Sequence, residues 1–323
     1  MVNICLIGCG GVGRRHLEAI LKVKYDINIE VVEPNIESIK STKELLPDFN
    51  NYFNKIDDVS DNIDICLIAT TANVRKQIIV ELLSKKSVKF IILEKVVFQS
   101  EDDFDDVINL FEKMGIKSWV NCHLRALPLY KKVKSVIDLS ERTFFKYYHS
   151  HGFKLSTSAI HVLDLFCYLC NDYNIEIEHM NITTDIVESK HKGCIEFNGN
   201  LRARSSKGHI LSIKGGNKET MGEYMTTVNS KLEIKSSEGD NPILNKNPDD
   251  KIGFVSVGND ITYIPYVWQS SLTNSYINDI IEKNDCDLST LEHSAKLHKI
   301  MLKSFRNSLK ENYNREVVDC PIT

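Results

Sequence analysis

Residues 1–20, MVNICLIGCGGVGRRHLEAI, decide the fold of this chain. A short apolar run leads into four glycines, and a helical pattern of apolar residues begins where the glycines end. Gly8, Gly10 and Gly13 stand in the spacing G-x-G-x-x-G. In this spacing the first glycine allows a tight turn, the second a close approach by a diphosphate, and the third close packing of helix on strand. The pattern favours a dinucleotide-binding loop over a merely structural turn. The predicted cofactor-binding residues of the loop are Gly8, Gly10, Gly11, Val12 and Gly13.

The rest of the first third alternates predicted strands with predicted helices. The apolar runs that predict strands are residues 3–8, 27–34, 63–70, 88–95 and 115–122. Segments with helical spacing, such as VRKQIIVELLSK (74–85), separate them. Continuous apolar runs are typical of strands that are buried on both faces of a parallel sheet. The alternation therefore predicts right-handed crossovers and a doubly wound parallel sheet of the Rossmann type.

Glu33 lies at the end of the second predicted strand, twenty residues after Gly13. A carboxylate at this place accepts hydrogen bonds from the adenosine ribose hydroxyls and repels a 2′-phosphate. No arginine stands beside it in the sequence EPNIES (33–38). We therefore expect NAD as the cofactor, with NADP as the less favoured alternative.

Composition narrows the class of protein. The chain has 323 residues, 42% of them hydrophobic, and a formal net charge of −4. This length is enough for two domains, and the near-neutral charge argues against nucleic acid or an anionic membrane as the main partner. No apolar run approaches the roughly 20 residues that span a bilayer, and the amino terminus lacks the basic region of a signal peptide. We expect a cytoplasmic protein.

The nine cysteines are scattered through predicted strands and helices. Cys167 and Cys170 form a C-x-x-C, but they lie in the apolar helical stretch AIHVLDLFCYLC (159–170) and have no partner pair. A metal or redox role and two core-facing thiols are both open, and the apolar surroundings favour the thiols. We therefore predict no metal site.

Beyond residue 140 the pattern changes to strands in which apolar residues alternate with polar ones. Turn sequences such as FNGN (197–200) separate these strands, and helices are predicted from residue 271 to residue 309. The alternation predicts an open, mainly antiparallel sheet. The expected fold class is α/β: a Rossmann domain at residues 1–122 and an α+β domain at residues 123–323.

Five stretches together resemble the Gfo/Idh/MocA family of oxidoreductases. They are GCGGVGRRH (8–16), IATTANVRK (68–76), EKVV (94–97), NCHLRALPLYKKVK (121–134) and STSAIHVLDLFCYL (156–169). The resemblance covers nearly the whole chain and extends to members from surface-polysaccharide and sialic-acid-like sugar pathways. It implies an NAD-dependent oxidoreductase that transfers hydride between nicotinamide and a CH–OH or keto carbon of a sugar or sugar derivative. It also implies that the second domain binds the substrate and forms a homodimer or homotetramer through its sheet.

Lys95 follows the strand FIIL at its carboxyl end, where a doubly wound sheet places its ligand crevice. By resemblance, its ammonium is catalytic and hydrogen-bonds the reacting oxygen of the substrate. The resemblance also makes Thr70, Glu94 and Lys95 contacts of the cofactor. The alternative for the pair Glu94-Lys95 is a solvated strand end.

His161 lies among apolar residues on a predicted helix. The resemblance makes it the general base, since an imidazole with an ordinary pKa of about 6.5 can accept and return a proton. A satisfied core histidine is the alternative. Asp164, three residues on, shares the helix face of His161 and is predicted to bind substrate or to orient the ring. Arg125 is predicted to bind a carboxylate or phosphate, or else to form an interdomain ion pair. The other predicted substrate-binding residues are His149, His151 and Thr157, with His123 and Asn121 ranked lower.

Three residues depart from the family pattern. Thr157 stands where many relatives have aspartate, Val96 where they have proline, and Arg75 where they often have histidine. Without the proline, a special peptide geometry after Lys95 is not guaranteed. Thr157 and Val96 leave open a non-catalytic regulatory protein that binds a dinucleotide or a sugar. A reductase of an imine or an unsaturated bond is a further alternative, because the resemblance extends to a family that includes such chemistry.

Overall fold

The computed structural model describes residues 1–149, 154–183, 185–215, 223–231, 233–238, 252–265 and 267–323. Within these ranges the chain forms two compact units. Unit 1 consists of residues 1–121, 268–294 and 323, and unit 2 consists of residues 122–267 and 295–322. No helix in the described ranges is long and apolar enough to cross a bilayer.

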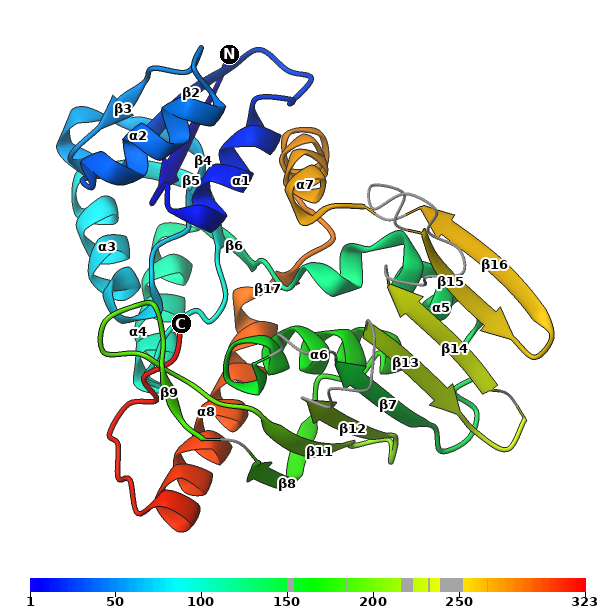
Figure 1. Cartoon of the computed structure of the whole chain (residues 1–323). Coiled ribbons are helices and arrows are strands. Elements are labelled where there is room, and N and C mark those ends of the chain that lie inside the picture. The colour runs from blue at the N-terminus through cyan, green and yellow to red at the C-terminus, as the bar shows by residue number, and fades with distance from the viewer. Residues whose placement is uncertain (150–153, 184, 216–222, 232, 239–251, 266) are drawn as a thin grey trace. The chain divides into compact units, whose positions relative to one another are not determined.

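Unit 1 contains a seven-stranded sheet in the order β17-β6-β5-β4-β1-β2-β3 (Figure 1). Its strands are β1 (Val2–Ile7), β2 (Ile27–Val32), β3 (Tyr52–Phe53), β4 (Asn62–Ile68), β5 (Ser87–Leu93), β6 (Lys117–Val120) and β17 (Ser289–Thr290). All neighbouring strands are parallel except β17 and β6. β1, β4 and β5 end in buried residues, as expected of strands covered on both faces. The predicted doubly wound sheet is confirmed, and its strand order reverses at β1, where such sheets bind ligands.

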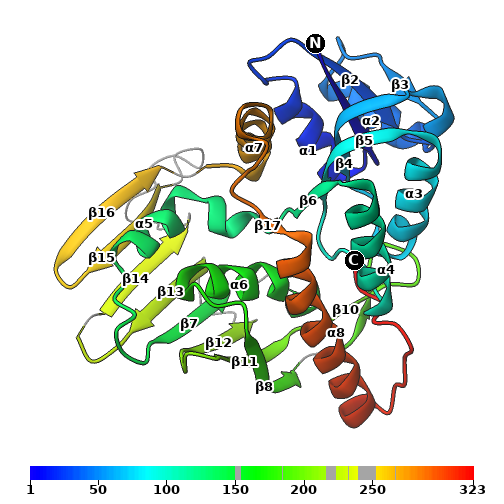
Figure 2. The ribbon, with the colours of Figure 1, turned by 180° about the vertical axis from the view of Figure 1, so that it is seen from behind.

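Helices and one short 3₁₀ turn connect the strands of unit 1. They are α1 (Gly11–Ile20), α2 (Ile36–Leu45), η1 (Ile56–Asp58), α3 (Ala72–Lys85), α4 (Asp102–Met114) and α7 (Gln269–Lys283). Helix α1 packs against α7, and α3 packs against α4 (Figures 1 and 2). The sequence sets the limits of α4, because aspartates fill its first turn, where they complement the helix dipole. It ends at Met114 and is followed by Gly115, whose φ of 67° is a left-handed conformation that glycine adopts readily.

Residues 268–294 lie in unit 1, whereas the sequence had assigned all of 123–323 to the second domain. The apolar side chains of Leu272, Ile277 and Ile280 on α7 are buried, and α7 packs on α1. Two residues of β17 then pair with β6 at the edge of the sheet. The segment therefore completes the first unit through packing and edge pairing, which a local sequence pattern does not reveal.

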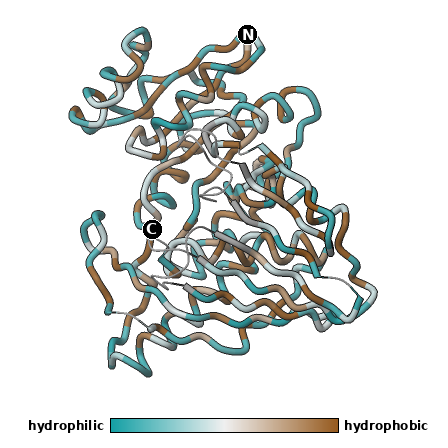
Figure 3. The backbone as a smooth tube through the Cα atoms, turned by 45° about the vertical axis from the view of Figure 1, so that its right-hand side comes forward, coloured by the Kyte–Doolittle hydropathy of each residue, from teal (hydrophilic) through white to brown (hydrophobic). Residues whose placement is uncertain are grey.

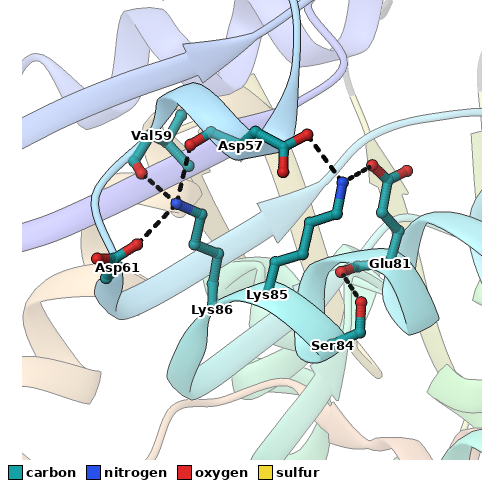
Figure 4. Close-up of polar contacts among 7 residues, drawn as sticks. All are labelled: Asp57, Val59, Asp61, Glu81, Ser84, Lys85 and Lys86. Carbon is teal, nitrogen blue, oxygen red and sulfur yellow. Dashed lines mark hydrogen bonds and ion pairs between the residues drawn. The ribbon is translucent and has the colours of Figure 1, made fainter.

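Hydrogen bonds join the end of α3 to the segment that precedes β4 (Figure 4). The ammonium of Lys86 donates to the carbonyls of Val59, at 2.6 Å, and Asp57, at 3.1 Å, and to Asp61 Oδ1 at 2.9 Å. Lys86 is buried although it is charged. All three ammonium hydrogens therefore have acceptors, which is the condition under which a buried charge is tolerated.

Unit 2 contains an eight-stranded sheet in the order β16-β15-β14-β13-β7-β12-β11-β8. Its strands are β7 (Phe144–His149), β8 (Ile175–Ile182), β11 (Gly199–Ser205), β12 (Ile210–Gly215), β13 (Glu223–Val228), β14 (Glu233–Glu238), β15 (Ile252–Val257) and β16 (Asp260–Pro265). A separate small ladder joins β9 (Val187–Glu188) and β10 (Ile195–Glu196). Only β12 and β7 are parallel neighbours in the large sheet, so the predicted mainly antiparallel sheet is confirmed.

One face of this sheet is covered by helices. The helical segments of unit 2 are η2 (His123–Ala126), α5 (Pro128–Val136), α6 (Leu155–Cys170) and α8 (Leu291–Tyr313), whose first turn belongs to unit 1. Helix α5 packs on β14 to β16, and α6 packs on β11 and β12 (Figures 1 and 2). Burial alternates along β11, because every second side chain faces the helices. Figure 3 shows hydrophilic and hydrophobic stretches alternating along the backbone. On α6, burial raises the pKa of the Cys167 and Cys170 thiols, as expected of core residues.

Candidate cofactor and catalytic site

Two glycines of the amino-terminal loop are required by the backbone itself. Gly8 has a φ of 90°, and a Cβ on it would lie 3.0 Å from the carbonyl carbon of Ala69. A Cβ on Gly13 would lie 2.0 Å from the carbonyl oxygen of Gly8, so the helix could not approach the strand. Gly10 and Gly11 differ, since a Cβ on either would meet nothing within 4 Å. Gly10 and Gly11 therefore border open space, which a bound group can enter.

The first turn of α1 offers N–H groups at the end of β1. The helix starts at Gly11, and its N-cap, Gly10, provides no side-chain hydrogen bond. The first N–H groups of a helix have no partner within the helix and carry partial positive charge. A diphosphate would satisfy the N–H groups of Gly11, Val12 and Gly13. The loop thus fits a dinucleotide by both its space and its donors.

Glu33 is held against the glycine loop. Its carboxylate accepts a hydrogen bond from the Cys9 N–H at 2.7 Å and another from the Asn35 N–H at 2.9 Å. The side chain is buried. Because an ionised carboxylate has about four acceptor sites, two remain for hydroxyl donors such as those of a ribose.

Glu94 lies in a buried network at the end of β5. The ring nitrogen His16 Nε2 lies 2.8 Å from Glu94 Oε1, and Asn121 Nδ2 donates to the same oxygen at 2.5 Å. The other ring nitrogen of His16 lies 2.8 Å from Thr273 Oγ1 on α7. Burial alone would raise the pKa of Glu94, but the hydrogen bond and the charge of His16, the hydrogen bond from Asn121 and the charge of Lys95 lower it to about 2. Glu94 is therefore a buried carboxylate that His16 and Asn121 hold by hydrogen bonds.

Thr70 and Lys95 follow the carboxyl ends of the neighbouring strands β4 and β5. The peptide bond from Lys95 to Val96 is cis, although Val96 is not proline. The special peptide geometry after Lys95, which the sequence alone did not guarantee, is therefore present. Arg75, on the first turn of α3, is buried and donates to main-chain carbonyls in both segments. Lys95 itself is partly exposed.

In unit 2, α6 carries His161, Asp164 and Thr157. His161 is 8% exposed, and its ring meets that of His123 edge-on, with centroids 4.6 Å apart. His123 comes from η2, which packs against α6. The structure thus brings the lower-ranked His123 into contact with the predicted general base. Thr157 lies in the first turn of α6, where its hydroxyl donates to the Lys154 carbonyl at 3.4 Å.

Arg125 is engaged by groups of its own unit. Its Nη1 lies 3.6 Å from Asp164 Oδ1 and donates to the hydroxyl of Tyr173 at 2.7 Å. The guanidinium carbon lies 4.8 Å from the centre of the Tyr168 ring. Burial alone would lower the pKa of Arg125, but the fully buried Asp164 carboxylate raises it. Arg125 thus forms an ion pair within unit 2, whereas the alternative predicted from the sequence was an ion pair between the two domains.

The candidate residues are divided between the two units. The glycine loop, Glu33 and Lys95 belong to unit 1, and His161 belongs to unit 2. His151 lies outside the described residues, and His149 is the last residue of β7, with its side chain outside them as well.

The sequence did not predict His16 and Thr273, the buried residues that continue the network of Glu94. His16 stands at the end of the glycine stretch, and Thr273 lies 257 positions beyond it. The available signal was a histidine at a position of α1 where the apolar pattern expects a core residue. The hydrogen bonds of Arg75 had no such signal in the sequence, because their acceptors are main-chain carbonyls, which every residue carries.

Residues 2–122 match the model of the Gfo/Idh/MocA family, described as an oxidoreductase family with an NAD-binding Rossmann fold. The match confirms the predicted NAD-binding Rossmann domain. A comparison with curated proteins found no match.

Solved structures share the fold along nearly the whole chain. An oxidoreductase from Agrobacterium radiobacter in complex with NAD⁺, L-tartaric acid and magnesium has a TM-score of 0.73 at 16% identity, covering 95% of this chain and 96% of its own. A mutant of KijD10, a 3-ketoreductase from Actinomadura kijaniata in complex with TDP-benzene and NADP, has a TM-score of 0.71 at 11% identity. The match covers 95% of this chain and 97% of the KijD10 chain. The transcriptional regulator Gal80p from Kluyveromyces lactis has a TM-score of 0.69 at 13% identity, and the match covers 99% of this chain and 94% of the Gal80p chain. At these identities the likeness shows the fold alone.

Proposed function

We propose that the chain is an NAD-dependent oxidoreductase of the Gfo/Idh/MocA family that acts on a CH–OH or keto carbon of a sugar or sugar derivative. The observation that carries the proposal is the loop at the end of β1. It combines an uncapped helix N-terminus, open space at Gly10 and a carboxylate, Glu33, held beside it. The family match over residues 2–122 supports the same cofactor. When bound, NAD supplies the nicotinamide carbon that takes or gives the hydride.

Two side chains divide the remaining chemistry in this proposal. The Lys95 ammonium hydrogen-bonds the reacting oxygen and stabilises negative charge on it. His161 accepts the hydroxyl proton in the oxidation and returns it in the reduction. Asp164, three residues after His161 on α6, pairs with Arg125 at 3.6 Å, and Thr157 offers a hydroxyl in place of a carboxylate. The resemblance of the sequence supports each of these roles.

The substrate class and the setting belong to the same proposal. The KijD10 structure, a 3-ketoreductase in complex with TDP-benzene, supports a keto carbon as the reacting group, and the resemblance of the sequence supports a sugar derivative. We place the reaction in surface carbohydrate biosynthesis in the cytoplasm. We further propose a homodimer or homotetramer formed through the sheet of unit 2, where β16 exposes 54% of Ile261 and 54% of Tyr263.

The test combines a binding assay with a turnover assay. NADH fluorescence on titration measures cofactor binding, and absorbance change with a panel of keto and amino sugars measures turnover. His161→Ala should keep NADH binding and lose turnover by about 10²–10⁴-fold, the usual contribution of general base catalysis. The matched control is His179→Ala, an exposed histidine of the same unit. Unchanged turnover in His161→Ala would reject the role of His161.

A regulatory protein without turnover is the second candidate. The hydroxyl of Thr157 in place of a carboxylate and the fold likeness to Gal80p favour it. Tight NADH binding without turnover across the whole panel would support this candidate. Turnover restricted to imines or activated double bonds would instead support the third alternative, a reductase of those bonds.

A further inference from the structure

We propose that Arg75 is a positioning residue for Lys95, tying the chain after Lys95 to the chain after β4. The inference deepens the proposed function and rests on it, because it assumes that Lys95 lies at the cofactor and the reacting oxygen. The hydrogen bonds of the Arg75 side chain go to main-chain carbonyls, so its effect on Lys95 is through the main chain.

The contacts of Arg75 join two segments that are far apart in sequence. Its Nη1 donates to the carbonyls of Val96, at 2.5 Å, and Val97, at 2.7 Å. Its Nη2 donates to the carbonyl of Thr70. One planar guanidinium therefore holds the two residues after Lys95 and the turn after β4 in one arrangement. A guanidinium suits this task because its donors are fixed relative to one another.

The burial of Arg75 argues against a role in stability alone. The side chain is 1% exposed, and in the described part of the chain no carboxylate forms an ion pair with it. Burial lowers the pKa of Arg75 to about 10, and the charge of Glu94 opposes this change. A buried charge carries a desolvation cost that an apolar side chain of similar size avoids. The charge is therefore better explained by the geometry that it enforces.

The residue before Lys95 is anchored as well. Glu94 receives hydrogen bonds from His16 and Asn121, while Arg75 binds the carbonyls that follow. The main chain of Lys95 is thus fixed from both sides, and its partly exposed side chain extends from a rigid support. Positioning of this kind matters because small displacements of a reacting group cost much of its effect.

The test measures the position of the Lys95 amine against bound cofactor. Each full-length protein is acetylated with N-hydroxysuccinimidyl acetate, with and without NADH, and the acetylation of Lys95 is followed by peptide mass spectrometry. NADH is used at about ten times the Kd of each variant, so about one site in eleven stays free and acetylation of Lys95 in wild type should slow about tenfold. Lys283, whose side chain is 64% exposed, serves as the internal reference.

The variants separate positioning from a general loss of structure. Arg75→Met should reduce the protection of Lys95 to less than about twofold, because the amine no longer stays at the cofactor even when every site is equally occupied. Arg75→Lys keeps the charge, but the lysine side chain has a single nitrogen that cannot reach both segments. Lys95 should therefore lose its protection from acetylation in this variant too. Arg75→Lys also replaces Arg75→Met if that variant does not fold. The control is Lys76→Met, which removes ion pairs of the next residue with Asp103 and Asp106 and should behave as wild type.

The outcomes are distinguishable. Full protection of Lys95 in both Arg75→Met and Arg75→Lys would overturn the positioning role while leaving the proposed function intact. Absence of NADH binding to wild type, or binding that leaves Lys95 unprotected in wild type, would overturn the proposed placement of Lys95 and this inference with it.

Discussion

His16 Nε2 lies 2.8 Å from Glu94 Oε1 in the interior of unit 1, and both side chains are buried. The contact joins the helix that follows the glycine loop to the strand end that carries Lys95. The two segments are therefore linked to each other by a buried hydrogen bond.

The buried carboxylate of Glu94 predicts a pH-dependent contribution to stability. Its hydrogen bonds and the charges of His16 and Lys95 hold its pKa in the folded protein at about 2, against about 4.3 for an unfolded chain. The unfolded state therefore binds this proton at higher pH. The stabilisation, about 3 kcal/mol, is complete above about pH 5 and is lost as the pH falls toward 2, with about half lost by pH 3.

Urea unfolding of wild type and Glu94→Gln at pH 7 and pH 3 measures this contribution. The stability difference between the two proteins should shrink by about half at the lower pH. Glu37→Gln, which changes an exposed carboxylate paired with Lys40, is the control and should show a much smaller pH effect. A difference that stays constant between the two pH values would contradict the prediction.

The four glycines of the loop should separate into two classes when they are replaced by alanine. Gly13→Ala places a Cβ 2.0 Å from the Gly8 carbonyl oxygen, so we expect a loss of stability on the order of 1–3 kcal/mol, as in overpacked cores. Gly10→Ala meets open space and should unfold like wild type, yet it should bind NADH at least about tenfold more weakly, because a diphosphate needs the close approach. Thermal unfolding and NADH titration measure the two effects. Equal NADH affinity in Gly10→Ala and wild type would contradict the assignment of the loop.

Much of unit 1 could be predicted because its signals are local. The run NICLIG and its glycines predict β1 and the turn, and the later strands β2, β4, β5 and β6 were expected within a few residues of their observed ends. The pairing of β17 with β6 could not be predicted in this way, since two residues at a sheet edge carry no pattern. The hairpin of β15 and β16 was missed in unit 2, although FVSVGNDITYIP (254–265) alternates around Gly258, whose φ is 60°.

The candidate site divides along the same line. The glycine loop and Glu33 could be predicted because their spacing within one strand–helix–strand unit is itself the signal. The partners of Glu94 could not, because the His16 contact spans 78 positions and that of Asn121 spans 27. Such contacts follow from the order of strands in the folded sheet, which no single segment encodes.

Replacing the neighbouring residues Lys85 and Lys86 should have unequal effects on stability (Figure 4). Replacing Lys86 by methionine removes the donor from the carbonyls of Asp57 and Val59. The cost should be about 1–3 kcal/mol, the range for buried groups left without a partner. Lys85→Met removes ion pairs with Asp57 and Glu81 that solvent reaches and should change stability little. Chemical denaturation of both variants gives the comparison, and a larger loss in Lys85→Met would reverse the interpretation.

Replacement of Glu33 by glutamine should weaken the discrimination between NADH and NADPH. The amide keeps the size of the side chain and an oxygen for the Cys9 N–H, but it removes the negative charge that repels a 2′-phosphate. Two unit charges about 6 Å apart at an effective dielectric constant of about 40 repel by about 1.4 kcal/mol, so the affinity ratio should move toward NADPH about tenfold. Fluorescence titration with both nucleotides measures the ratio at one salt concentration, because salt screens this repulsion. Glu37→Gln on α2 removes an equal charge from the exposed surface and should leave the ratio unchanged. An unchanged ratio in Glu33→Gln would mean that the preference for NAD arises from another part of the loop.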